Sequence, residues 1–194
     1  AQLKADVSSY SLPDDPILTQ QLLAHLAAQV DVIISTGGVS AGEEDHVKNS
    51  VAALGQVQFW KIAMKPGKPF MFGRIETAAK PQATPILGLP GNPVSSFVTY
   101  ALLAKPFVQA CQGVGARLCQ PRYVPVAAAL EGGGRDEYLR VAQTEQGLVP
   151  VANQSSGRLS SLQQADGLML LAAGQSIQPG ELAEFWTLAE LLAP

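Results

Sequence analysis

The sequence predicts a mixed α/β domain followed by a small all-β domain, and two observations carry this prediction. Between residues 16 and 112, apolar runs of strand character alternate with segments of helical period, as is typical of an α/β sheet. From about residue 117 the period changes to two, and short strands are separated by turns rich in Gly and Pro. We therefore predict domains at 1–116 and 117–194, the second being a sandwich or a barrel.

The composition limits the classes of protein to which this chain can belong. The 194 residues are 47% hydrophobic and 15% charged, which predicts a sizeable core rather than disorder. The net charge of -3 gives no long-range attraction to nucleic acid or to acidic membranes. No apolar run approaches the ~20 residues that span a bilayer. Cys111 and Cys119 do not form a C-x-x-C pair, so we expect free thiols and a cytoplasmic location.

The sequence pattern of the first domain predicts an alternation of strands and helices. In chain order, we expect a strand at 5–10, a helix at 17–29, a strand at 31–36, a helix at 43–54, strands at 57–64, 69–75 and 85–89, and a helix at 94–112. Asp15 should cap the first helix. The β-branched run at 31–36 is typical of a parallel strand buried on both faces. The link at 65–69 is too short for a crossover helix, so its strands should pair antiparallel, and Pro106 should disturb the last helix.

Two glycine turns follow predicted strands directly. Gly37-Gly38 ends the strand at 31–36, and Pro90-Gly91-Asn92-Pro93 ends the strand at 85–89, with Asn92 expected to cap the next helix and Pro93 to start it. Turns at the carboxyl ends of parallel strands open on one edge of the sheet, where backbone N–H groups can hold an anion. A diglycine alone is a weak signal, because many such turns contain Gly for packing.

A turn with two lysines lies between the two glycine turns in the sequence. Lys65 and Lys68 flank Pro66-Gly67, and such a turn can direct both ammonium groups at one compact anion. Solvated surface lysines are an equally weighted interpretation. Asp45 could hold Mg²⁺ next to a bound oxyanion, although acidic residues in a first helical turn also favour the helix dipole. Arg135, Arg140, Ser155 and Ser156 would by themselves be interpreted as surface polar residues.

Three motifs in this order resemble one family. They are Ser35-Thr36-Gly37-Gly38-Val39-Ser40 with Gly42-Glu43 and Asp45 behind it, Lys65-Pro66-Gly67-Lys68-Pro69, and Gly88-Leu89-Pro90-Gly91-Asn92-Pro93-Val94-Ser95. Together they resemble the molybdopterin molybdenumtransferases, the MoeA and gephyrin E-domain family. The segments at Gly134-Arg135, Arg140 and Gln154-Ser155-Ser156 also look like that family's C-terminal domain, so the resemblance covers the whole chain.

The resemblance implies a three-layer αβα domain and an enzyme of molybdenum cofactor biosynthesis. Such an enzyme inserts molybdate into adenylylated molybdopterin and releases AMP, with Mg²⁺ or a similar divalent ion. The implied catalytic residues are Asp45, Lys65 and Lys68. The implied metal ligands are Asp45 and Asp15, with Asp14 as the alternative to Asp15. The implied substrate-binding residues are Gly37, Gly38, Ser40, Pro69, Pro90, Gly91, Asn92, Pro93 and Ser95, and, for passing molybdate on from the second domain, Arg135, Arg140, Ser155 and Ser156.

The chain also departs from the family. Members carry a Thr-Gly-Asp-Glu type turn and two further domains before the segment where this sequence begins. We therefore expect a fragment that is inactive alone, with an uncovered sheet edge or an altered partner at that edge, and a homodimer in the full-length protein. Two alternatives stay open. One is a molybdopterin adenylyltransferase, which the trailing β domain disfavours, and the other is a non-catalytic scaffold of the same fold.

Overall fold

The computed structural model describes residues 3–40, 45–115 and 119–193. The chain forms two compact units: unit 1 comprises Ala1–Ile62 and Gly67–Gly91, and unit 2 comprises Ala63–Pro66 and Asn92–Pro194. The helical segment after Asn92 therefore belongs to the same compact unit as the β domain. The sequence boundary at residue 116 is a different kind of division, and it stays a prediction.

Unit 1 is built on a four-stranded mixed sheet with the order β1-β5-β4-β2. Strand β1 (Ile33–Thr36) is parallel to β5 (Thr84–Leu89), and β4 (Met71–Ile75) is antiparallel to β5 and to β2 (Gly55–Trp60). The antiparallel pairing expected across the lysine turn is thus confirmed. A short link allows no other direction.

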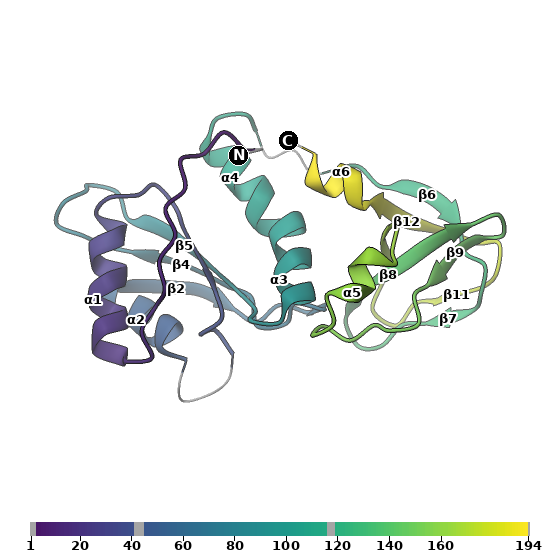
Figure 1. Ribbon diagram of the computed structural model, residues 1–194, viewed down its shortest axis with the longest axis horizontal. Coiled ribbons are helices and arrows are strands. Elements are labelled where there is room, and N and C mark those ends of the chain that lie inside the picture. The colour runs from purple at the N-terminus through teal and green to yellow at the C-terminus, as the bar shows by residue number, and fades with distance from the viewer. Residues whose placement is uncertain (1–2, 41–44, 116–118, 194) are drawn as a thin grey trace. The chain divides into compact units, whose positions relative to one another are not determined.

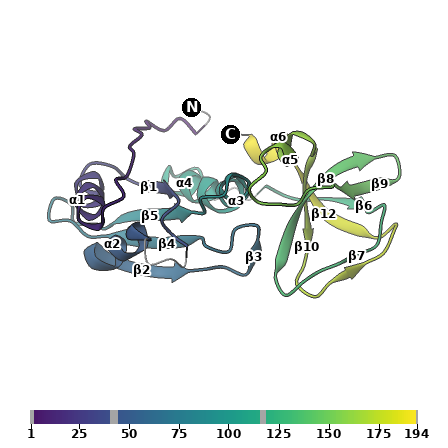
Figure 2. The ribbon, with the colours of Figure 1, turned by 60° about the horizontal axis from the view of Figure 1, so that its bottom comes forward.

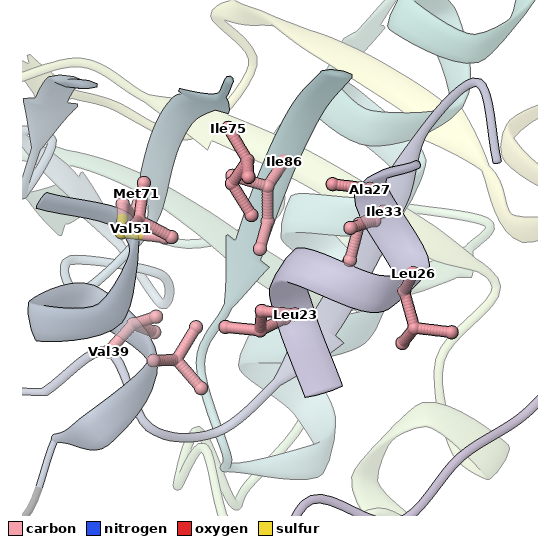
Figure 3. Close-up of a cluster of buried hydrophobic side chains, with 10 residues drawn as sticks. Leu23, Leu26, Ala27, Ile33, Val39, Val51, Met71, Ile75 and Ile86 are labelled. Atoms are coloured by element: carbon pink, nitrogen blue, oxygen red, sulfur yellow. The ribbon is translucent and has the colours of Figure 1, made fainter. Parts of the chain in front are cut away.

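Two helices pack together in unit 1, α1 (Pro16–Ala27) and α2 (His46–Leu54) (Figure 1). The predicted cap is confirmed, because the Asp15 carboxylate accepts a hydrogen bond from the Leu18 N–H at 2.8 Å. Figure 3 shows Leu23 and Ile86 within the buried cluster that joins helices and strands. Burial of such side chains removes apolar area from water and is the main stabilising contribution of this unit.

Two expectations for unit 1 need correction, and a third falls partly on residues that the structure does not describe. The strand at 5–10 does not form, and these residues carry no regular structure. β1 is not buried on both faces: its residues alternate between buried and exposed, and Ile34 is 40% exposed, because β1 lies at an edge of the sheet. Helix α2 begins at His46, and the expected start at 43–44 lies outside the described residues.

Unit 2 begins its long helical segment with α3 (Pro93–Thr99) and ends it with α4 (Lys105–Cys111). Between them lies one π-helical turn, η1 (Tyr100–Ala104). The predicted disturbance near Pro106 is confirmed. Proline has no N–H to donate to the preceding turn, and the wider π turn accommodates this.

The β domain of unit 2 has a six-stranded sheet with the order β3-β8-β10-β12-β6, and β9 pairs with β8. The bounds are β3 (Met64–Lys65), β6 (Arg122–Pro125), β8 (Asp136–Thr144), β9 (Gly147–Pro150), β10 (Gly167–Leu171) and β12 (Leu182–Thr187), with β7 (Leu130–Glu131) and β11 (Ser176–Ile177) in a two-stranded sheet and short helices α5 (Ser160–Gln163) and α6 (Leu188–Leu192) (Figure 2). The predicted class, an α/β domain followed by a β-rich domain, is confirmed. None of the helices in the described part of the chain is long and apolar enough to cross a membrane.

Candidate functional site

The two glycine turns of unit 1 lie side by side. Thr36 and Leu89 are register partners at the ends of β1 and β5, so both strands stop at the same edge. The Gly37 N–H donates to the Leu89 carbonyl at 2.9 Å, and a Cβ placed on Gly91 would lie 3.6 Å from the Gly37 Cα. The expectation that both turns open on one edge of the sheet is confirmed.

Positions 37 and 38 both favour glycine because of their backbone conformation, and position 38 also because of a neighbouring side chain. Gly37 has φ of 88° and Gly38 has φ of 67°, in the left-handed region that strains other residues. A Cβ on Gly38 would lie 2.6 Å from the Val47 Cγ2 atom, whereas one on Gly37 would meet nothing within 4 Å. The turn therefore exposes backbone where a side chain would stand, as close approach to a ligand requires.

The two lysines of the turn have different environments. The Lys65 ammonium donates to the Glu137 carboxylate at 2.8 Å, because β3 pairs with β8. Lys68 is exposed and forms no ion pair within residues 3–40, 45–115 and 119–193. The sequence did not predict the Glu137 partner, which lies far along the chain. Lys68 is thus the freer of the two cations.

The acidic residues that the structure describes near these turns do not gather into a cluster. Asp45 is 7% exposed and precedes α2, but its side chain forms no capping hydrogen bond to that helix. Asp15 caps α1, and Asp14 lies 3.5 Å from His46. Among the described residues, no three His, Cys, Asp or Glu side chains are grouped so as to hold a metal ion. Since Mg²⁺ usually takes one or two protein carboxylates and keeps water and phosphate ligands, Asp45 fits as a single ligand.

The beginning of α3 meets the hydroxyl-rich segment of the β domain within unit 2. Asn92 and Pro93 begin the helix as predicted, but the Asn92 side chain makes no capping hydrogen bond. Its Nδ2 group donates instead to the Ser156 Oγ at 3.2 Å. The Val94 N–H donates to the Ser156 carbonyl at 3.1 Å. Ser95, at 4% exposure, is buried in the first turn of α3. Two segments named separately from the sequence, 92–95 and 155–156, are therefore in contact.

Arg135 and Arg140, the two arginines singled out from the sequence of the β domain, differ, and the surface interpretation is wrong for Arg140. Arg140 is fully buried, and its Nη2 donates to the carbonyls of Asn153 at 3.3 Å and Ser155 at 3.4 Å. Burial lowers the pKa of Arg140 from its ordinary value, although an arginine stays charged at neutral pH. Arg135 is only half-buried, and its Nη1 lies 3.5 Å from the Met64 carbonyl oxygen.

Comparison with known proteins gives the family. Residues 1–110 match the model of a probable molybdopterin binding domain, and residues 122–188 match the model of the MoeA C-terminal region, domain IV. The chain belongs to the MoeA and gephyrin E-domain family. The resemblance inferred from the three motifs is thereby confirmed.

Individual members of the MoeA family show the extent of the likeness. The chain is 45% identical over 102 residues to a molybdopterin molybdenumtransferase of Haemophilus influenzae, covering 53% of this chain and 24% of that protein. It is 31% identical over 172 residues to the one of Nostoc, covering 84% and 38%. A molybdopterin biosynthesis MoeA protein of Pyrococcus horikosii has a similar structure, with a TM-score of 0.69 and 27% identity, over 90% of this chain and 41% of that one. The chain thus spans less than half the length of these relatives.

The sequence analysis did not single out Trp60 and the two lysines beside its ring, which lie next to the first MoeA motif. The Trp60 Nε1–H donates to the Val39 carbonyl at 2.7 Å, and the Lys48 and Lys61 ammonium groups each lie 3.9 Å from the Trp60 ring centroid. Lys61 has φ of 69°, which is unusual for a residue with a side chain. These contacts fix the turn that contains Gly37 and Gly38. The adjacent pair Trp60-Lys61 just before the lysine turn was the available signal.

Proposed function

We propose that this chain carries out its part of a molybdopterin molybdenumtransferase reaction in molybdenum cofactor biosynthesis. In that reaction molybdate is inserted into adenylylated molybdopterin, and AMP is released. The observation that carries the proposal is the meeting of the glycine turns after β1 and β5, where Gly37 and Gly91 leave the backbone uncovered. Sheet edges of this kind are where α/β proteins bind anionic ligands.

Molybdate is a tetrahedral dianion, and the lysine turn has the chemistry to receive it. Fixed cations and nearby N–H or O–H donors bind such an oxyanion through charge-assisted hydrogen bonds. Lys68 is exposed and without an ion pair in the part of the chain that the structure describes, whereas Lys65 shares its charge with Glu137. We infer that Lys68 contributes more to affinity than Lys65. Ser40, Pro69 and Ser95 complete the proposed molybdate residues.

The adenylylated pterin is the larger substrate, and we assign it to the glycine turns. Gly37, Gly38, Pro90 and Gly91 would admit its phosphate close to backbone N–H groups, with Asn92 and Pro93 beyond them. Asp45 would hold Mg²⁺, which supplies charge neutralisation at the phosphate when bound. Asp15 is the weaker metal candidate, because one of its carboxylate oxygens already accepts the Leu18 N–H.

A titration of molybdate into this chain tests the proposal. Calorimetry at low ionic strength, with sulfate as competitor, compares the unchanged chain with Lys65→Ala, Lys68→Ala and the double variant. One charge-assisted contact is worth about 2 kcal/mol, so Lys68→Ala should weaken binding by at least about 10-fold and Lys65→Ala by less. The matched control Lys4→Ala/Arg74→Ala removes two exposed charges elsewhere in unit 1 and should change nothing.

The outcomes separate the candidate functions. Saturable binding that the double lysine variant abolishes supports the transferase. Binding that is indifferent to both lysines contradicts the lysine site and favours a non-catalytic scaffold. An adenylyltransferase is disfavoured by the match of residues 122–188 to the MoeA C-terminal region. A homodimer of the full-length protein and a cytoplasmic location remain predictions of the same proposal, which sedimentation of the purified protein and cell fractionation would check.

A further inference from the structure

Arg140 is a cation in the interior of the β domain, with no carboxylate bonded to it among the described residues. Its exposure is 0%, and its guanidinium donates through Nη2 to the backbone carbonyls of Asn153 and Ser155. Its Nε is buried and has no hydrogen-bond partner in the described part of the chain. A charge buried in this way is costly unless neighbouring dipoles are held around it. The carbonyls of the 153–155 segment are those dipoles.

The backbone of Arg140 is tied to the same segment. Its N–H donates to the Gln154 Oε1 at 3.1 Å, and its carbonyl accepts from the Gln154 Nε2 at 2.8 Å and from the Val151 N–H at 2.9 Å. The Gln154 Nε2 also donates to the Val151 carbonyl at 2.9 Å. Side chain and backbone of one residue of β8 thus fix the path of the chain from Val151 to Ser155.

The fixed segment ends on Ser156, which meets the beginning of α3. The Ser156 carbonyl accepts the Val94 N–H, and its Oγ accepts from the Asn92 amide. A hydroxyl that accepts one hydrogen bond still has its proton to donate. The Ser155 Oγ likewise accepts from the Gly157 N–H at 3.4 Å. The segment is therefore arranged so that two hydroxyl groups keep their O–H donors for another partner.

We propose that Arg140 is a positioning residue, which holds the Ser155-Ser156 hydroxyl groups in place beside the start of α3 and does not itself contact the oxyanion. The oxyanion part rests on the proposed function, whereas the positioning part rests only on the contacts above. Of the two arginines singled out from the sequence, Arg135 is then the one that can reach a ligand, because it is half-buried and Arg140 has no exposed surface.

The amide of Val94 reports on this arrangement directly. An N–H in the first turn of a helix has no acceptor within the helix, so its hydrogen bond to the Ser156 carbonyl is the protection that the structure gives it. Hydrogen exchange by NMR on the 194-residue chain would compare Arg140→Met, which keeps the bulk, with Arg140→Lys, which keeps a donor. Arg135→Met is the matched control. Gln154→Ala loosens the same segment without changing the guanidinium.

Exchange of the Val94 amide should become at least about 10-fold faster in Arg140→Met, change less in Arg140→Lys, and stay unchanged in Arg135→Met. The effects of Arg140→Met and Gln154→Ala should not add in the double variant, because both act on one segment. Unchanged Val94 exchange in the Arg140 variants would overturn the positioning role. If Arg140→Met does not fold, Arg140→Lys and Gln154→Ala decide the matter by the same measurement.

Molybdate titration separates positioning from direct contact. Arg140→Met and Gln154→Ala should weaken molybdate binding by similar factors, since both displace the same hydroxyl groups. A loss of molybdate binding in Arg140→Met with normal Val94 exchange would instead make Arg140 a ligand and contradict the proposal. If the unchanged chain binds no molybdate, the proposed function loses its support while the exchange result still decides whether Arg140 holds the segment.

Discussion

In unit 1 the conformation of the turn at Gly37-Gly38 depends on residues that have no side chain. In unit 2 the conformation of the segment at Ser155-Ser156 depends on the side chains of Arg140 and Gln154. A Cβ on Gly38 would meet Val47, so the first turn is damaged by added atoms. The second segment is fixed by buried hydrogen bonds, so it is damaged by removed atoms. The two segments thus fail under opposite kinds of substitution. This contrast makes their contributions separable by experiment.

The largest expected effect is that of Gly38→Ala. It forces a side chain into the left-handed region and against the Val47 methyl group at 2.6 Å, and it should cost about 3 kcal/mol of unfolding free energy in unit 1. Gly37→Ala is the matched control: it is strained in φ but meets nothing within 4 Å, and should cost about 1 kcal/mol. Equal costs for the two would contradict the role given to the Val47 contact.

The chain allows this to be measured for one unit at a time. It has two tryptophans, of which Trp60 lies in unit 1 and Trp186 in unit 2. Urea unfolding followed by fluorescence in a Trp186→Phe background therefore reports unit 1 alone. The two glycine variants are compared in that same background, so the cost of losing Trp186 cancels.

A smaller effect is expected for Trp60→Phe, which tests whether unit 1 also relies on one side chain. The variant keeps an aromatic ring but loses the hydrogen bond to the Val39 carbonyl. Leaving that carbonyl unpaired should cost about 1 kcal/mol, and exchange of the Gly37 amide should become about 5-fold faster. Unchanged exchange at Gly37 would mean that the glycines alone define the turn, and the contrast between the units would then be complete.

A last effect, of about the size expected for Trp60→Phe, lies away from both segments, at the capping box of α6. The Glu190 carboxylate accepts hydrogen bonds from the Thr187 N–H at 3.0 Å and from the Thr187 hydroxyl at 2.8 Å, and these two bonds hold the pKa of Glu190 below its ordinary value of 4.5. The Thr187 Oγ1 in turn accepts from the Glu190 N–H at 3.1 Å. A lowered carboxyl pKa stabilises the fold above pH 4.5, and this stabilisation is lost as the pH falls through the lowered value. Thr187→Ala should cost about 1 kcal/mol at pH 7.

The same variant should partly flatten the loss of stability below pH 4.5, because it removes the hydroxyl bond to Glu190 but keeps the bond from the backbone N–H of residue 187. Trp186 fluorescence in urea, recorded at several pH values, measures this in unit 2. A parallel acid-side profile in both chains would contradict the role of the Thr187 hydroxyl in lowering the Glu190 pKa. Val94 exchange should be normal in this variant, which separates general stability of unit 2 from the Arg140 contacts.

Local patterns predicted much of this fold. Asp15 before Pro16 gave the start of α1, the short lysine link gave the antiparallel pairing of β2 and β4, and Pro106 gave the irregular helix. Each of these depends on residues that are close in the sequence. The strand expected at 5–10 did not form, because a strand needs a neighbour and these residues have none in the described sheets.

The residues of the candidate site also fall into two groups, those that local sequence predicts and those that depend on distant contacts. Gly37, Gly38, Pro90 and Gly91 could be named from the sequence because strand ends and glycine turns are local features. The partner of Lys65, the burial of Arg140 and the contact of Ser156 with Val94 could not. Each joins residues that are distant in the chain, such as Lys65 and Glu137, and no periodic pattern specifies such a pair.

Sequence patterns were enough to predict the family, most of the helices and strands of unit 1, and the two glycine turns. These follow from short-range sterics, from the fixed φ of proline, from the freedom of glycine, and from motifs that lie within a few residues. The tertiary structure was needed to show that Lys65 pairs with Glu137 while Lys68 has no ion pair among the described residues, and that Arg140 is buried rather than a surface cation. Charge and burial depend on which distant segments pack together, so they become defined only when the sheets form.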